Sequence, residues 1–178
     1  HHLTSFHLLP AQWLSDVIDS IKSDDPDSKL CSTRRSAGVP FFVQAVTSTE
    51  PATGGRKCFH SVMKELLILA LSHVREDRLQ SSQAQVHALN ILRALYRDAR
   101  LGEEVVPYVA DGLKASILGF KSEQWAVQNS ATLLLSALMT RMFGVKRSKD
   151  ETNMSKKNCQ TGRAFFHHYP SLYPFLLS

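Results

Sequence analysis

Apolar positions recur with a helical period along most of the chain, which indicates an all-α protein. The longest such segment spans 122–143, where Gly144 is expected to end the helix. Placing successive residues 100° apart gives this helix one apolar stripe, formed by Val127, Ala131, Leu134, Leu135, Leu138 and Met142. The opposite face is polar but uncharged, with Trp125 at its centre. An ordinary surface helix carries charges there, so we expect a neighbouring helix or a ligand to cover this face.

Further helices are predicted over 10–22, from about 32 to 46, and over 57–74, 83–100, 103–120 and 163–178. Pro40 lies inside the second of these helices and is expected to kink it, because its ring removes a backbone hydrogen bond. No stretch alternates apolar and polar residues over the length of a strand.

A short pattern occurs twice, 43 residues apart, as Ala88-x-x-Ile91-Leu92-x-Ala94-Leu95 and Ala131-x-x-Leu134-Leu135-x-Ala137-Leu138. HEAT and armadillo units repeat every 40–47 residues or so, although any two leucine-rich helices could share such a match. We therefore expect a HEAT/armadillo-like α-solenoid segment of stacked helix pairs. Residues 1–29 would hold an N-terminal helix and an acidic turn, or the preceding repeat. Residues 30–178 would form the helical segment, with a basic loop at 145–163.

The composition, 178 residues of which 43% are hydrophobic, suits one domain or one segment of a longer chain. The helix predicted at 163–178 is apolar and uncapped, which favours a segment of a longer chain over a single domain. No apolar run approaches the roughly 20 residues that span a bilayer, so we expect no membrane insertion. The three cysteines, Cys31, Cys58 and Cys159, are odd in number and far apart, which is typical of reduced, intracellular thiols.

The net charge of +5 is concentrated in one stretch. Six basic residues against two acidic ones lie between 146 and 163: Lys146, Arg147, Lys149, Lys156, Lys157 and Arg163. A localised basic segment attracts polyanions, and a solvated loop is the alternative interpretation.

Two arginine groups are further candidates for binding a nucleic acid or a partner. Arg93, Arg97 and Arg100 share one face of their predicted helix and could contact phosphates, or could form a solvated face balanced by nearby acids. Arg34 and Arg35 open a helix, where the helix dipole disfavours cations. They are therefore expected to pair with a carboxylate of the adjacent repeat or with an external phosphate.

Trp125 is predicted to belong to the structural core, together with Val127, Ala131, Leu134 and Leu138. On that interpretation Trp125→Ala would lower the free energy of unfolding by about 3–5 kcal/mol. The alternative is that Trp125 stacks on a nucleic-acid base while Asn129 hydrogen-bonds to it.

No catalytic arrangement is visible in the sequence. GxSxG, GxGxxG and HExxH are absent, and the histidines and cysteines lack metal-ligand spacing. Gly54-Gly55-Arg56-Lys57 precedes a helix and could cradle an anion, but it lacks the P-loop spacing. We therefore expect no enzyme activity, no cofactor and no metal.

Five blocks of sequence, in order, resemble the thyroid adenoma-associated protein family. They are Cys31–Phe41 (CSTRRSAGVPF), Gln85–Leu95 (QVHALNILRAL), Trp125–Ser130 (WAVQNS), Phe143–Arg147 (FGVKR) and Gly162–Phe166 (GRAFF). The resemblance covers residues 30–178 and implies a cytoplasmic α-solenoid that is a non-catalytic partner of an FtsJ-like tRNA 2′-O-methyltransferase.

In that family the enzyme carries S-adenosylmethionine, and the solenoid positions the tRNA for ribose methylation in the anticodon loop. The family often has an arginine where this chain has Gln128. The alternative function is a protein–protein interaction solenoid without a role in RNA binding.

Overall fold

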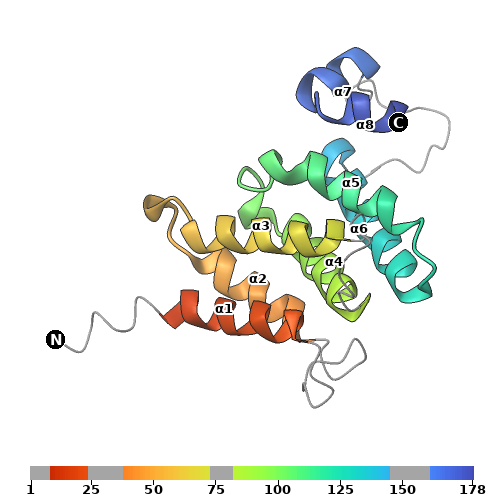
Figure 1. The fold of residues 1–178 in the computed structure, drawn as a ribbon. Helices are drawn as coiled ribbons and strands as arrows, with labels where there is room; N and C mark the ends of the chain where they lie inside the picture. Colours follow the sequence, from red (N-terminus) through yellow and green to blue (C-terminus); the bar gives the residue numbers. More distant parts are fainter. Residues whose placement is uncertain (1–8, 24–37, 73–81, 145–160) are drawn as a thin grey trace, which may run out of the picture.

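The chain folds into short helices stacked in pairs (Figure 1). The computed structural model describes residues 9–23, 38–72, 82–144 and 161–178. Its α-helices are α1 (Leu9–Lys22), α2 (Val39–Thr49), α3 (Lys57–Leu71), α4 (Ser82–Arg97), α5 (Val109–Gly119), α6 (Trp125–Phe143), α7 (Gly162–His168) and α8 (Leu172–Leu177). Three single turns of 3-10 helix, η3 (Ala52–Gly54), η5 (Ala99–Leu101) and η6 (Val106–Tyr108), lie between them. Within these ranges the chain contains no strand, as predicted.

The first six helices form three pairs, α1 with α2, α3 with α4, and α5 with α6. Their packing builds two layers. The first layer consists of α1, α3 and α5, and the second layer consists of α2, α4 and α6, in which α4 packs extensively on both neighbours. Figure 1 shows α1 at one end of the stack, with α7 and α8 beyond α5 at the other.

Long-range contacts fix the direction of the helices. Lys22 at the end of α1 pairs with Glu65 late in α3, so these helices of the first layer run the same way. Arg141 near the end of α6 bonds to backbone oxygens at the end of α4, so these helices of the second layer also run the same way. Gly119 ends α5 against Ala131 in the first half of α6, so this pair is antiparallel.

The core lies between the two layers. Four residues of the stripe predicted on α6, namely Val127, Ala131, Leu134 and Leu138, are fully buried, which confirms that part of the prediction. In the other copy of the repeated pattern, Ala88, Ile91, Leu92 and Leu95 of α4 are fully buried, whereas Leu135, the counterpart of Leu92, is half-buried. The two copies of the repeated pattern therefore belong to neighbouring helices of the second layer. Ala131 also lies against Gly119 of α5, where an added Cβ would come within 2.6 Å of the alanine side chain.

Several predicted helix ends are wrong for identifiable reasons. Pro40 does not kink α2, because the helix begins at Val39 and proline fits its first turn. The helix predicted over 83–100 ends at Arg97, since Asp98 is extended and accepts a hydrogen bond from the N–H of Arg100. The final helix is divided in two before Pro170, because a residue that precedes proline is disfavoured in helical geometry.

Candidate interaction surface

Trp125 is the largest departure from the sequence prediction. It is 75% exposed, so the prediction that it belongs to the core is wrong. The apolar face of α6 is already filled by its buried aliphatic residues. Trp125 is the first residue of the helix and lies on the opposite face. We predicted that a neighbouring helix or a ligand would cover that face, and none of the described helices does so.

The exposed face of α6 continues from Trp125 as a row of uncharged polar side chains, at Gln128, Asn129, Thr132, Ser136 and Thr140. Both threonine hydroxyls donate to backbone oxygens four residues earlier. The Gln128 amide nitrogen donates to the Ser122 oxygen at 2.7 Å. The Asn129 side chain forms no hydrogen bond within the described residues, so its amide can bind another molecule.

The predicted ridge of arginines on one helix is only partly correct. Arg100 lies beyond the end of α4, and its guanidinium donates to both carboxylate oxygens of Asp98, at 3.1 and 2.9 Å. Arg93, half-buried, and Arg97, exposed, remain on α4. Neither of these two arginines pairs with any residue in the described ranges. Two unpaired cations four residues apart therefore lie on the outer side of the second layer.

Asp98 joins three parts of the structure. Its side chain is 4% exposed. Besides Arg100, it accepts a hydrogen bond at 2.9 Å from Gln44 of α2. These donors lower the pKa of Asp98 to about 2, the bonds from Arg100 contributing most and burial opposing them.

Arg141 completes this junction from α6. Its guanidinium donates to the backbone oxygens of Tyr96 and Asp98, at 2.9 and 2.6 Å. Carbonyl groups at the end of a helix lack partners within the helix, and a cation also suits the negative end of the helix dipole. Arg141 thus has a structural role, unlike Arg93 and Arg97.

The Gly54–Lys57 loop does not offer a free anion site. The N–H groups of Cys58 and Phe59, at the start of α3, donate to the two carboxylate oxygens of Glu50, both at 2.9 Å. The protein's own carboxylate therefore occupies the place that an anion would take. Arg56 adopts a left-handed backbone with φ 44° and directs its side chain to the Thr47 oxygen and to Glu104.

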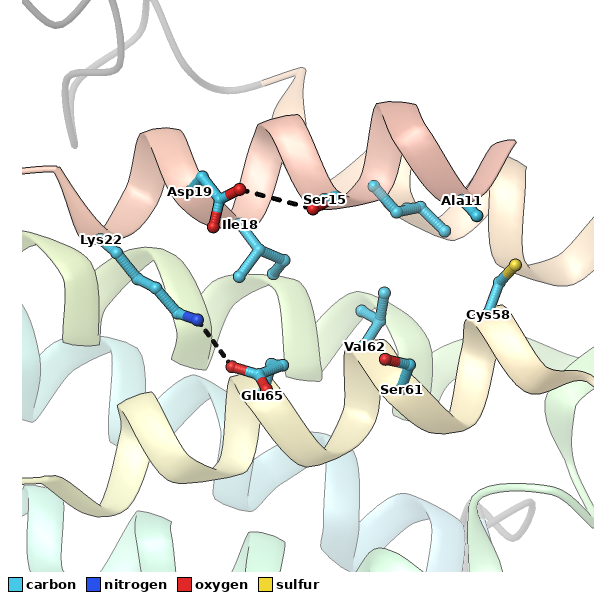
Figure 2. Close-up of a pocket in the computed structure, with 10 residues that line it drawn as sticks. Ala11, Ser15, Ile18, Asp19, Lys22, Cys58, Ser61, Val62 and Glu65 are labelled. Atoms are coloured by element: carbon cyan, nitrogen blue, oxygen red, sulfur yellow. Dashed lines mark hydrogen bonds and ion pairs between the residues drawn. The ribbon is translucent and has the colours of Figure 1, made fainter. Parts of the chain in front are cut away.

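A groove of about 230 Å³ lies between α1 and α3 (Figure 2). The buried side chains of Leu14, Ile18 and Val62 line it, and the Lys22–Glu65 ion pair lies at one end. Cys58 at the other end is a free thiol. Burial, and then the nearby Glu50 carboxylate, raise the pKa of this thiol, which therefore stays protonated and weakly nucleophilic.

Several predicted candidates cannot be placed. Arg34, Arg35 and the five basic residues Lys146, Arg147, Lys149, Lys156 and Lys157 lie outside the described residues, as do Cys31 and Cys159. Arg163 is exposed near the start of α7. None of the described helices is long and apolar enough to cross a membrane.

The helices of the two layers differ in their charged residues. The helices of the first layer carry Asp16, Asp19, Glu65 and Asp111 beside four lysines. The helices of the second layer contain no aspartate or glutamate, and their charged residues are three arginines. The second layer also exposes Phe41 (69%) and Trp125 (75%). It is therefore a surface of aromatic, amide and guanidinium groups.

Two family models together match nearly the whole chain. Residues 1–126 match the family described as "THADA/TRM732, DUF2428". The chain belongs to this family. Residues 128–178 match a model described as "Trm732, C-terminal TPR repeats", so the C-terminal region is of a helical-repeat type. The two matches meet near the start of α6, and the first also includes residues 1–29, which lie outside the resemblance described from the sequence.

Several curated relatives are named "tRNA (32-2'-O)-methyltransferase regulator THADA". Those of Chlorocebus aethiops and Homo sapiens are each 60% identical over 173 residues, and that of Canis lupus familiaris is 59% identical. Each match covers 97% of this chain but only 9% of the relative's own length. No solved structure matches the chain.

Sequence reasoning missed the structural roles of Gln44, Glu50 and Arg141, and it considered Asp98 only as an acid that could balance the arginines. Aspartate is a common capping residue, so Asp98 could have been recognised as a helix boundary. Arg141 lies in the last turn of a helix, where a cation is favourable, which is a weaker signal. Nothing in the sequence indicates Gln44 or Glu50, because both act on residues of other elements.

Proposed function

We propose that this chain is one segment of a longer regulatory subunit that supports 2′-O-methylation of tRNA ribose by a separate methyltransferase. The observation that carries this proposal is the 60% identity, over 97% of the chain, with proteins named as regulators of a tRNA (32-2'-O)-methyltransferase. Their name places the methylated ribose at nucleotide 32, which belongs to the anticodon loop. We expect the partner to be FtsJ-like and the complex to be cytoplasmic.

On this proposal the chain is non-catalytic. The sequence has no GxGxxG loop to bind S-adenosylmethionine, so cofactor binding and methyl transfer are assigned to the partner. Burial and the Glu50 carboxylate also raise the pKa of the Cys58 thiol, which keeps this cysteine a weak nucleophile. The contribution of this segment is to bind and to position.

We further propose that the segment is an α-solenoid of the HEAT/armadillo type. Three helix pairs stack in two layers, and helices within a layer run in the same direction. The repeated alanine–leucine pattern occupies equivalent places in α4 and α6. Both features support a repeating unit of one helix pair, and such stacks offer extended surfaces for macromolecules.

The basic loop at 145–163 is proposed to contact tRNA phosphates, with Arg34 and Arg35 as further candidates. Contacts of this kind release counterions, so they make affinity depend on salt but not on sequence. Replacing Lys146, Arg147, Lys149, Lys156 and Lys157 by serine in the full-length protein should weaken binding of all tRNAs to a similar extent. The slope of log affinity against log salt should fall by roughly 0.7–0.9 for each lost contact.

Reconstitution tests the proposed function. Full-length regulator, methyltransferase, tRNA and S-adenosylmethionine are mixed, and methylation at nucleotide 32 is measured with each protein alone and with both together. We expect methylation only with both proteins. Methyl transfer by the regulator alone would show that it is an enzyme. Equal methylation with and without the regulator would overturn the regulatory role.

A further inference from the structure

The outer face of the second layer has a chemistry that the proposed function does not by itself assign. We propose that this face of α2, α4 and α6 binds unpaired nucleotides of an RNA loop, with Trp125 stacking on a base and Arg93 and Arg97 contacting phosphates. The inference rests on the proposed function and deepens it, because it names the surface and the kind of RNA structure that the surface recognises.

Trp125 provides the stacking surface. Its side chain is 75% exposed, and no aromatic ring of the described residues stacks on it. Phe59 and Tyr96, which stabilise the fold from within the core, are buried by contrast. Bases in a duplex are already stacked on one another, so an exposed ring selects bases that are unpaired and accessible.

Polar groups beside Trp125 suit base edges rather than phosphates. Asn129 is one helical turn further along α6, and its free amide both donates and accepts hydrogen bonds. Glu123, exposed just before the helix, would repel a phosphate at this end. A neutral base is therefore the part of a nucleotide that fits next to Trp125.

The phosphate contacts lie at the other end of the face. Because α4 and α6 run in the same direction and Arg141 joins their ends, Arg97 and Trp125 lie near opposite ends of the second layer. Sixteen residues from Trp125 to Arg141, at a rise of 1.5 Å, correspond to about 24 Å along the layer. Several nucleotides of a single strand would be needed to reach from the stacking position to the arginines.

Charge favours RNA over a protein partner as the occupant. Arg93 and Arg97 have no acidic neighbour in the helices of the second layer, so the face holds uncompensated positive charge that a polyanion would neutralise. A protein partner would have to supply carboxylates at the same places. The first layer lacks this property, because acidic residues there lie among the lysines.

The test uses the full-length protein and two RNA probes, a hairpin with an unpaired loop and a fully paired duplex of equal length. Trp125→Ala should weaken hairpin binding at least about fivefold, the effect of losing one stacked base, and should leave duplex binding unchanged. Trp13→Ala is the matched control, because Trp13 is 47% exposed on α1 in the first layer. Trp13→Ala should change neither the affinity for the hairpin nor that for the duplex. Both tryptophan variants should keep the wild-type melting temperature.

A second pair of variants tests the arginines. Arg93→Gln combined with Arg97→Gln should lower the slope of log affinity against log salt by roughly 0.7 for each lost phosphate contact. Lys57→Gln combined with Lys64→Gln removes the same charge from exposed positions of α3 and should leave the slope unchanged.

Unchanged hairpin binding by Trp125→Ala and by the arginine variant would overturn the inference. So would a loss of methyltransferase affinity without a loss of RNA affinity, which would make this face a protein interface. Neither result would affect the proposed function, since that depends on whether the wild-type regulator is required for methylation at nucleotide 32.

Discussion

The two layers of this helical stack are built from similar apolar stripes but differ in what they show to solvent. The first layer mixes acidic and basic side chains along α1, α3 and α5. The second layer has no acidic residue in its helices and exposes aromatic, amide and guanidinium groups. A mixed-charge surface stays soluble without attracting a particular partner, whereas helices whose charged residues are all arginines, two of them unpaired, favour an anionic one.

The layers also differ in how their helices are joined. In the second layer, half-buried hydrogen bonds made by Gln44, Asp98 and Arg141 link α2, α4 and α6. In the first layer, α1 and α3 are joined by the Lys22–Glu65 ion pair, whose side chains are 40% and 42% exposed. Water screens an exposed pair, so the second layer should depend much more on its polar links.

The largest expected effect is on the core that both layers share. Leu134→Ala removes a fully buried side chain of α6 and should lower the free energy of unfolding by about 2–5 kcal/mol. Met139→Ala is the control on the same helix, because Met139 is 46% exposed, and it should cost less than about 1 kcal/mol. Urea unfolding of the two variants measures the difference. If both variants lowered the free energy of unfolding equally, α6 would not bury the face that carries Leu134.

Asp98→Asn should have the next largest effect, because it removes the charge on which the junction of the second layer depends. The folded-state pKa of about 2 lies below the ordinary value of 3.8, so this carboxylate stabilises the protein above about pH 4. The shift corresponds to about 2 kcal/mol, which is lost as the pH falls towards 2.

The measurement is the free energy of unfolding of wild type and Asp98→Asn between about pH 7 and pH 2. The variant should be less stable at neutral pH, and the difference should shrink as the pH falls. A difference that is constant over this range would contradict the role given to the ionised carboxylate.

The smallest expected effect is in the first layer. Lys22→Gln breaks the exposed ion pair with Glu65 and should cost less than about 1 kcal/mol in the free energy of unfolding. The cost should decrease further at high salt. If Lys22→Gln lowered the free energy of unfolding as much as Asp98→Asn does, the two layers would not differ in how far they depend on polar links.

Sequence reasoning predicted the helices and their buried stripes well, because the helical period alone decides which residues share a face. It could not decide whether another element covers a given face, and Trp125 was misplaced for that reason. It also missed the links at Gln44–Asp98 and Arg141–Tyr96, whose partners are 54 and 45 residues apart. The uncharged face of α6 was visible in the sequence, but its continuity with the acid-free α2 and α4 requires the fold.

Photo-crosslinking tests the division between the layers most directly. The full-length protein is irradiated with an RNA hairpin that carries 4-thiouridine in its unpaired loop, and crosslinked tryptic peptides are identified by mass spectrometry. We predict crosslinks to the peptide 122–141, which contains Trp125, and none to the peptide that ends at Lys22 and contains Trp13. Crosslinks confined to peptides of α1, α3 and α5 would contradict the assignment of the second layer as the RNA-binding face.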